Sequence, residues 1–187
     1  MYAYAANNPV HYIDPDGNSI YNRVNTRIAN AIKMLYYKSE TFRKMYRSLA
    51  SEYNSQGQKL FVMIDDKSYK YAGNTQSQDC LIEAPSLVMS NIQDDDYKTE
   101  ILPVGTEVQA IIINIDLDKI DSQNLNLLEV VAEEFSHADE AARQGTTNWN
   151  ERAKNENKMP YRNRPEEKRA KEVTSQILQE IKDYEED

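Results

Sequence analysis

Residues 107–145 read EVQAIIINIDLDKIDSQNLNLLEVVAEEFSHADEAARQG, and this stretch decides the fold. Its aliphatic run, residues 110–115, predicts a strand near the centre of a sheet. Residues 121–124 supply turn and capping side chains ahead of a predicted helix over residues 125–143, which ends at Gly145. The apolar stripe of that helix is expected to pack on the sheet.

The flanking segments add further elements of both kinds. The apolar spacing over residues 20–54 predicts helix, in two pieces that meet near Ser39. Residues 146–164 are expected to form a polar loop, and Pro165 opens a last helix. The pattern predicts a β-hairpin of Lys59–Ile64 with Ser68–Tyr71. It predicts further strands at Cys80–Ile82, Leu87–Met89, Thr99–Leu102 and Glu107–Ile115. We therefore expect an α+β fold with N-terminal helices, a mainly antiparallel sheet and two C-terminal helices that meet over it.

Composition excludes several classes of function. The chain has 187 residues, of which 31 are acidic and 22 basic, so its net charge of −9 argues against a nucleic-acid partner. A single cysteine, Cys80, excludes an intramolecular disulfide and a thiolate zinc cluster. No apolar run approaches the ~20 residues of a membrane span. The N-terminus does not resemble a signal peptide, so we expect either delivery by another carrier or a cytoplasmic protein.

Turn-forming residues dominate the first 18 positions. Residues 2–17 read YAYAANNPVHYIDPDG, which combines aromatic residues, Asn-Pro and Asp-Pro-x-Gly. This pattern resembles the core terminus of bacterial RHS/YD-repeat proteins. The resemblance implies an RHS remnant over residues 1–18 and a C-terminal toxin or effector domain over residues 19–187.

In the RHS family the repeats form a cage around a variable C-terminal toxin. The Asp-Pro-x-Gly segment lies where the chain cleaves itself, so the resemblance singles out Asp14 and Asp16. It also implies a secreted or delivered bacterial effector of the polymorphic-toxin type, with the cage of its own parent chain and an immunity protein as partners. Asn18 departs from the leucine that often follows the glycine in the family.

The predicted helix over residues 125–143 carries the other candidate site. Glu129, Glu133 and His137 are spaced four apart and therefore share one helix face. The segment Glu133-Glu134-Phe135-Ser136-His137 resembles the His-Glu-x-x-His helix of zincins, with glutamate in place of the first histidine. By that resemblance, Glu133 and His137 would bind a zinc ion and Glu134 would act as general base.

A second segment extends the resemblance. Glu167-Lys168-Arg169-Ala170 is similar to the Glu-x-x-Ala helix that supplies the third ligand in gluzincins. Glu167 would be that ligand, and Glu166 is the alternative. The resemblance implies a zinc-dependent metallopeptidase, a hydrolase of protein or peptide substrates.

Glutamate at position 133 leaves other interpretations open. Two carboxylates and one imidazole select zinc less strongly than two imidazoles and one carboxylate, and they suit harder ions. The chain could instead be an inactive zincin-like or binding module, or Glu133 and His137 could be an ordinary ion pair on the helix surface. It could also be a toxin of another class, such as a nuclease, which a basic cleft would favour.

Overall fold

The structure is a computed structural model that describes residues 20–51, 53–81, 86–91 and 97–186. The RHS-like segment 1–18, with Asp14 and Asp16, lies outside the described residues. The elements in chain order are β1 (Ile20–Arg23), α1 (Thr26–Lys38), α2 (Glu40–Leu49), β2 (Lys59–Asp65), β3 (Gly73–Leu81), β4 (Ser86–Asn91), β5 (Tyr97–Leu102), β6 (Glu107–Ile115), α3 (Leu117–Ser122), α4 (Leu127–Gln144), α5 (Thr146–Glu156), the 3-10 turn η3 (Tyr161–Asn163) and α6 (Pro165–Glu186).

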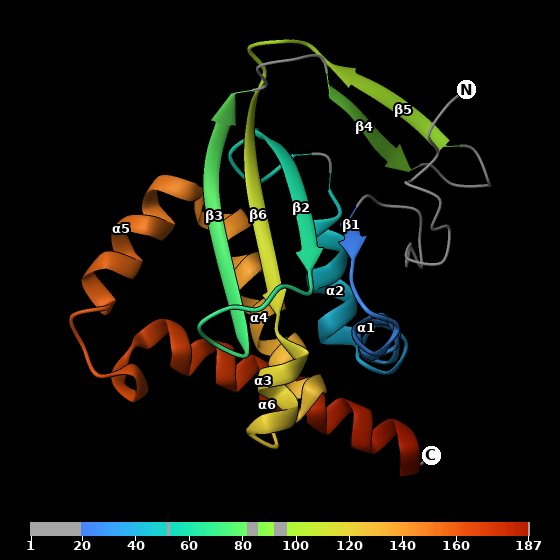
Figure 1. The fold of residues 1–187 in the computed structure, drawn as a ribbon, viewed down its shortest axis with the longest axis vertical. Helices are drawn as coiled ribbons and strands as arrows, with labels where there is room; N and C mark the ends of the chain where they lie inside the picture. Colours follow the sequence, from blue (N-terminus) through green and yellow to red (C-terminus); the bar gives the residue numbers. More distant parts are fainter. Residues whose placement is uncertain (1–19, 52, 82–85, 92–96, 187) are drawn as a thin grey trace.

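The chain has the expected α+β fold, but its main sheet is mixed. Four strands lie in the order β1-β2-β6-β3, while β4 and β5 form a separate antiparallel pair (Figure 1). β1 and β2 are parallel, β2 and β6 are parallel, and only β3 is antiparallel to its neighbour β6. The expectation of a mainly antiparallel sheet is therefore wrong, because the helical pair α1–α2 provides the crossover that a parallel β1–β2 pairing needs.

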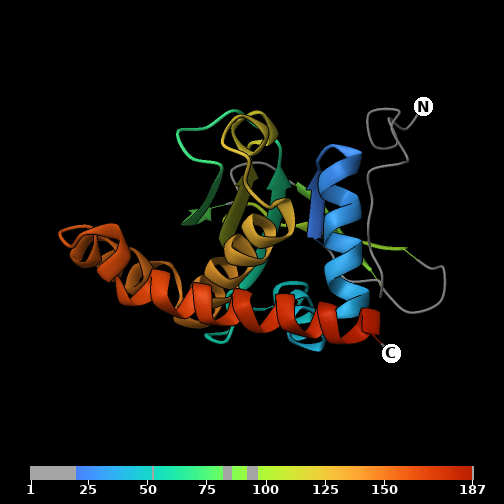
Figure 2. The same cartoon turned by 90° about the horizontal axis from the view of Figure 1, so that it is seen from below.

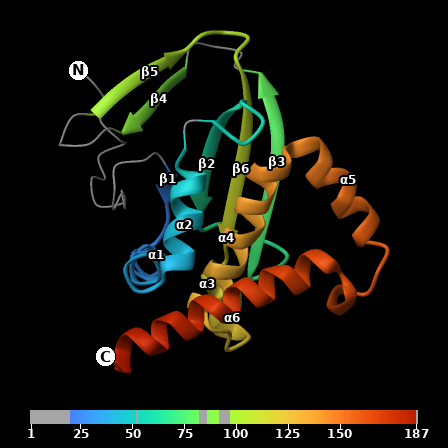
Figure 3. The ribbon, with the colours of Figure 1, turned by 180° about the vertical axis from the view of Figure 1, so that it is seen from behind.

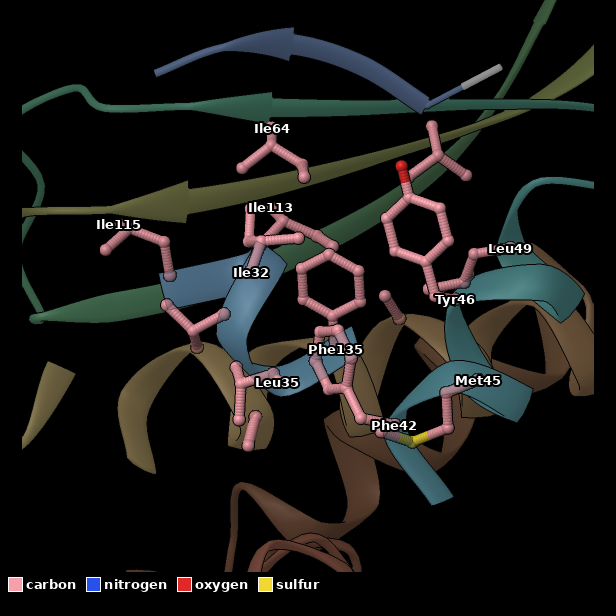
Figure 4. Packing of buried hydrophobic residues seen from close by; sticks show 14 of the residues in the cluster. Ile32, Leu35, Phe42, Met45, Tyr46, Leu49, Ile64, Ile113, Ile115 and Phe135 are labelled. Atoms are coloured by element: carbon pink, nitrogen blue, oxygen red, sulfur yellow. The ribbon is translucent and has the colours of Figure 1, made fainter. Parts of the chain in front are cut away.

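One face of this sheet carries the helices. Figure 3 shows α1, α2 and α4 against that face, and Figure 2 shows α6 crossing this helix layer on the side away from the sheet. Phe135 of α4 is fully buried, with its ring centroid 4.8 Å from that of Phe42 and 6.1 Å from that of Tyr46 (Figure 4). Ile111 and Ile113 of β6 are also fully buried, as expected for the central aliphatic run.

Capping side chains set the helix boundaries. Ser39 closes α1 and begins α2, where its hydroxyl accepts a hydrogen bond from the Phe42 N–H. Asn126 caps the start of α4, and Gly145 ends α4 with a φ of 74°, a backbone conformation that glycine adopts without strain. The predicted junction near Ser39 and the predicted stop at Gly145 are both confirmed.

Three local expectations are wrong. The predicted hairpin of Lys59–Ile64 with Ser68–Tyr71 does not form, because β6 lies between β2 and β3. The predicted loop over 146–164 contains α5, whose buried Trp149 anchors a helix that has few other large apolar side chains. Residues 20–23 form β1 rather than the start of the first helix. In the described part of the chain, no helix is long and apolar enough to span a membrane.

Candidate metal site

The contact between α4 and the start of α6 brings together the three residues that the sequence predicted as ligands. Glu133 and His137 are one turn apart on α4, and Glu167 lies in the first turn of α6. One ligand atom from each lies within 4.8 Å of the others, and His137 Nε2 is 3.6 Å from Glu167 Oε2. Among the described residues, Glu133, His137 and Glu167 form the group of metal-ligating side chains that could hold a metal ion.

The site has a buried side and a more exposed side. His137 is 7% exposed and Glu134 is 8% exposed, whereas Glu133 and Glu167 are half-buried. The rings of His137 and Trp149 pack edge to face, with their centroids 6.1 Å apart. The imidazole therefore lies on the buried side, and so does most of Glu167, whose side chain is 13% exposed with Oε2 buried.

The two imidazole nitrogens face different glutamates. Nε2 faces Glu167, while Nδ1 lies 3.1 Å from Glu166 Oε1, on the other side of the ring. Glu166, the alternative ligand in the sequence interpretation, is not part of the group formed by Glu133, His137 and Glu167. Its carboxylate instead faces Nδ1, where it could accept a hydrogen bond from a protonated Nδ1 and so orient the ring.

Carboxylates surround His137 closely enough to change its ionisation. Burial alone would lower the pKa of His137, but the carboxylates of Glu166, Glu167 and Glu134 outweigh it and raise the pKa to about 10. Neither His137 Nδ1 nor Glu167 Oε2 has a well-aligned hydrogen-bond partner among the described residues. Buried polar atoms without such partners are uncommon in folded proteins and require an explanation.

These features fit a divalent cation. Metal–ligand bonds of the usual length place the ligand atoms of a tetrahedral zinc site about 3.4 Å apart. The 3.6 Å between His137 Nε2 and Glu167 Oε2 is close to that separation, and the 4.8 Å limit for the whole group requires only a small closure. A cation would also satisfy the unpartnered Glu167 Oε2.

Glu134, the predicted general base, lies under the start of β3. Its Oε2 accepts a hydrogen bond of 2.7 Å from the Thr75 hydroxyl. Burial raises the pKa of Glu134 to about 7, against the opposing effects of His137 and Thr75. A Cβ at Gly73 would lie 2.7 Å from Glu134 Cγ, so glycine at this position makes room for the carboxylate.

Sequence reasoning missed Tyr161. The hydroxyl of this η3 residue donates a hydrogen bond of 3.2 Å to Glu133 Oε1. Burial, together with the hydrogen bonds and charges of Glu167 and Glu133, raises its pKa, so Tyr161 remains a neutral O–H donor. Tyr161 is far from α4 in sequence and belongs to no motif, so no sequence signal identifies it.

The half-buried Arg152, which the sequence placed in a polar loop, belongs to an ion-pair network that the sequence did not predict. Arg152 of α5 lies 2.6 Å from Glu140 of α4, 3.5 Å from Glu156 and 3.8 Å from Glu166 of α6. The neighbouring Arg169 Nε is 3.2 Å from the same Glu140 carboxylate. This network joins the three helices behind His137 and fixes the carboxylate that faces its Nδ1.

No family model matches this chain, and neither a curated protein nor a solved structure is significantly similar to it. The geometry of the site is therefore the basis for any functional conclusion.

Proposed function

We propose that this chain is a divergent, metal-dependent peptidase of the zincin type, which uses Glu133, His137 and Glu167 as ligands of a zinc ion. The observation that carries the proposal is the convergence of these three side chains from α4 and α6, with the buried Glu134 beside them. A bound divalent ion would supply a Lewis acid and would lower the pKa of a coordinated water molecule.

In this proposal Glu134 is the general base. Its pKa of about 7 allows it both to accept a proton from water and to return it near neutral pH. The Thr75 hydroxyl holds one of its oxygens, which fixes the carboxylate relative to His137. Tyr161 donates its O–H to Glu133, and in this proposal it would orient that ligand.

The edge of β3 supports a peptide as the substrate. The Ala72 carbonyl accepts a hydrogen bond from the Asp116 N–H, toward β6, whereas the Ser77 carbonyl accepts one from the Asn150 side chain, on the other edge. Because backbone groups alternate along a strand, Gly73 and Thr75 direct their N–H and C=O groups to that same outer edge. An extended peptide could add to this edge beside Glu134.

Metal content and cleavage test the proposal together. We expect about one zinc ion per chain after zinc is supplied, and cleavage of unstructured peptides. His137→Ala should lose both properties. Glu134→Gln should keep the metal and lose cleavage by about 100-fold or more, as expected when a general base is removed. Glu129→Gln is the matched control, because Glu129 is exposed and one turn from Glu133 on the same helix.

The outcomes separate the remaining interpretations. Failure of the parent chain to bind zinc or another divalent ion would refute the metal site and leave His137 as an ion-pair partner of Glu166 and Glu167. Metal binding without cleavage would favour an inactive zincin-like or binding module. Cleavage of nucleic acid in place of peptides would assign the site to a nuclease.

We further propose that the chain is the effector tip of an RHS-type polymorphic toxin. The sequence of residues 2–17 is the support for this part of the proposal. Intracellular expression in bacteria should arrest growth, and His137→Ala should relieve the arrest without lowering the amount of protein. Equal growth inhibition by the parent and by His137→Ala would refute toxicity through this site.

A further inference from the structure

Two basic side chains lie against the ring of Tyr161 at the more exposed side of the site. Lys171 Nζ is 5.3 Å from the centre of this ring, and Arg164 Cζ is 5.5 Å from it. The hydroxyl of the same ring donates to the ligand Glu133. Both cations therefore lie on a ring whose hydroxyl contacts one proposed metal ligand, and the charge of Arg164 also lowers the pKa of another, Glu167.

These two cations have no acidic partner at ion-pair distance within the described residues. Lys171 is exposed on α6, one turn after Glu167, and Arg164 precedes the helix. Arg164 Nε instead lies 3.4 Å from the Met159 carbonyl, which carries no charge. Neither cation is held in an ion pair, although Arg164 acts on Glu167 at longer range, so both charges can act on a group that enters the site.

The charge balance favours an anionic substrate. The charges of Glu133 and Glu167 would cancel that of a divalent ion, and Arg152 lies against Glu166, so Arg164 and Lys171 add positive charge beside the site. Glu134, with a pKa of about 7, offsets part of that charge at neutral pH. Exposed Glu129, one turn from Glu133, opposes part of this field. The surrounding segment, residues 158–171, contains six basic and two acidic residues, in contrast to the net charge of −9 of the whole chain.

We propose that this site selects peptides that carry a carboxylate next to the scissile bond, held by Arg164 and Lys171. This inference rests on the proposed peptidase function and adds the class of substrate to it. The carboxylate could belong to an aspartate or glutamate side chain or to the C-terminus of the peptide. Both sources present the same planar anion to a guanidinium and an ammonium group.

Matched peptides distinguish these sources. The zinc-loaded full chain is given internally quenched peptides with Glu or Gln on each side of the scissile bond, each with a free or an amidated C-terminus. We expect a preference of about fivefold in kcat/KM for the carboxylate, the size of a solvent-accessible ion pair. A preference for Glu in amidated peptides assigns a side chain, and a preference for the free C-terminus alone assigns the terminal carboxylate.

Variants that remove one charge identify the residues that cause the preference for a carboxylate. Arg164→Gln and Lys171→Gln should each reduce it, and the double variant should abolish it without loss of bound zinc. Lys154→Gln, an exposed lysine on α5, is the control and should retain the full preference. Added salt should weaken the preference in the parent chain, because the cations are accessible to solvent.

Equal kcat/KM for Glu and Gln peptides, with cleavage intact, would refute the inference and leave the peptidase proposal standing. If no peptide is cleaved, the binding of the same peptides to the zinc-loaded Glu134→Gln variant, measured by calorimetry, decides the inference: equal affinities refute it. Tighter binding of a single-stranded oligonucleotide, lost in the double variant, would also refute it and assign the cations to phosphates. Absence of bound zinc would refute the proposed function and this inference with it.

Discussion

The two ends of α6 both place glutamates against another helix, but they treat the carboxylates differently. Near its C-terminal end, Glu180 accepts hydrogen bonds from the Ser39 hydroxyl and from both the N–H and the hydroxyl of Thr41. At the N-terminal end, Glu166 and Glu167 lie on either side of His137, and Glu167 Oε2 has no hydrogen-bond donor among the described residues.

This difference separates a structural carboxylate from one that is available to a ligand. The donors around Glu180 are part of the junction between α1 and α2, and both of its oxygens accept hydrogen bonds from them. Glu180 therefore holds α6 to that junction. Burial opposes the ionisation of Glu167, but His137, Tyr161 and Arg164 outweigh it and lower its pKa. Its Oε2 still has no well-aligned hydrogen-bond partner among the described residues, and a bound cation would supply one, which is a reason to expect function there.

The largest expected effect tests directly whether Glu167 and Glu180 differ in their role. Glu167→Gln removes a proposed ligand and should weaken zinc binding on the order of 100-fold or more, since even outer-shell changes cost 10- to 100-fold. Glu180→Gln, the same change at the other end of α6, should leave zinc affinity unaltered. Zinc titrations against a competing chelator measure both. Comparable losses in the two variants would contradict the assignment of Glu167 as a ligand.

Glu166 provides the next test, because it contacts His137 without joining the ligand group. Glu166→Gln should weaken zinc binding by about tenfold through loss of the charge that orients the imidazole. Glu172→Gln, an exposed glutamate of α6, is the control. A weakening as large as that of Glu167→Gln would make Glu166 a ligand, and no weakening would remove it from the site.

Gly73 allows Glu134, the proposed general base, to be displaced without changing its chemistry. In Gly73→Ala the new methyl group meets the flexible end of Glu134, so the carboxylate must move away from Thr75. We expect cleavage to fall by about tenfold, because small displacements of a catalytic group are costly. Zinc content should stay the same. Unchanged cleavage would mean that the position of Glu134 under β3 is not required.

Local patterns predicted much of the fold and the three residues of the candidate metal site. The aliphatic run of β6 and the spacing of α4 predicted both elements, and the i, i+4 spacing of Glu133 and His137 predicted that they share a face. Strand order and direction depend on contacts between distant segments. For that reason the parallel pairing of β2 with β6 was not predictable from either strand alone.

The parts of the site that the sequence did not predict also depend on contacts between distant segments. α5 has a weak apolar stripe, and Arg152 joins it to α4 and α6 through ion pairs that no periodicity encodes. Tyr161 reaches Glu133 across 28 positions of sequence. The separate roles of Glu166 and Glu167 depend on which imidazole nitrogen each one faces, and adjacent residues in a sequence give no indication of that.

The smallest expected effect concerns stability at the satisfied end of α6. Partial burial opposes ionisation of Glu180, but the hydrogen bonds from Ser39 and Thr41 outweigh it and lower its pKa to about 2. Glu180→Gln should reduce the free energy of unfolding by about 1 kcal/mol at neutral pH, the usual net value of such hydrogen bonds. Chemical denaturation of the zinc-free variant and parent measures the difference.

The sign of the pH dependence follows from the lowered pKa. A carboxylate whose pKa is lower in the folded than in the unfolded chain stabilises the fold above its unfolded pKa, and this contribution is lost as the pH falls through the folded value. The difference between parent and Glu180→Gln should therefore be constant above pH about 5 and shrink toward pH about 2, the folded pKa of Glu180. If the difference in unfolding free energy between parent and Glu180→Gln persists unchanged at pH about 2, the Glu180 side chain holds the junction through its shape and packing. The two ends of α6 would then not differ in how they use the charge of a carboxylate.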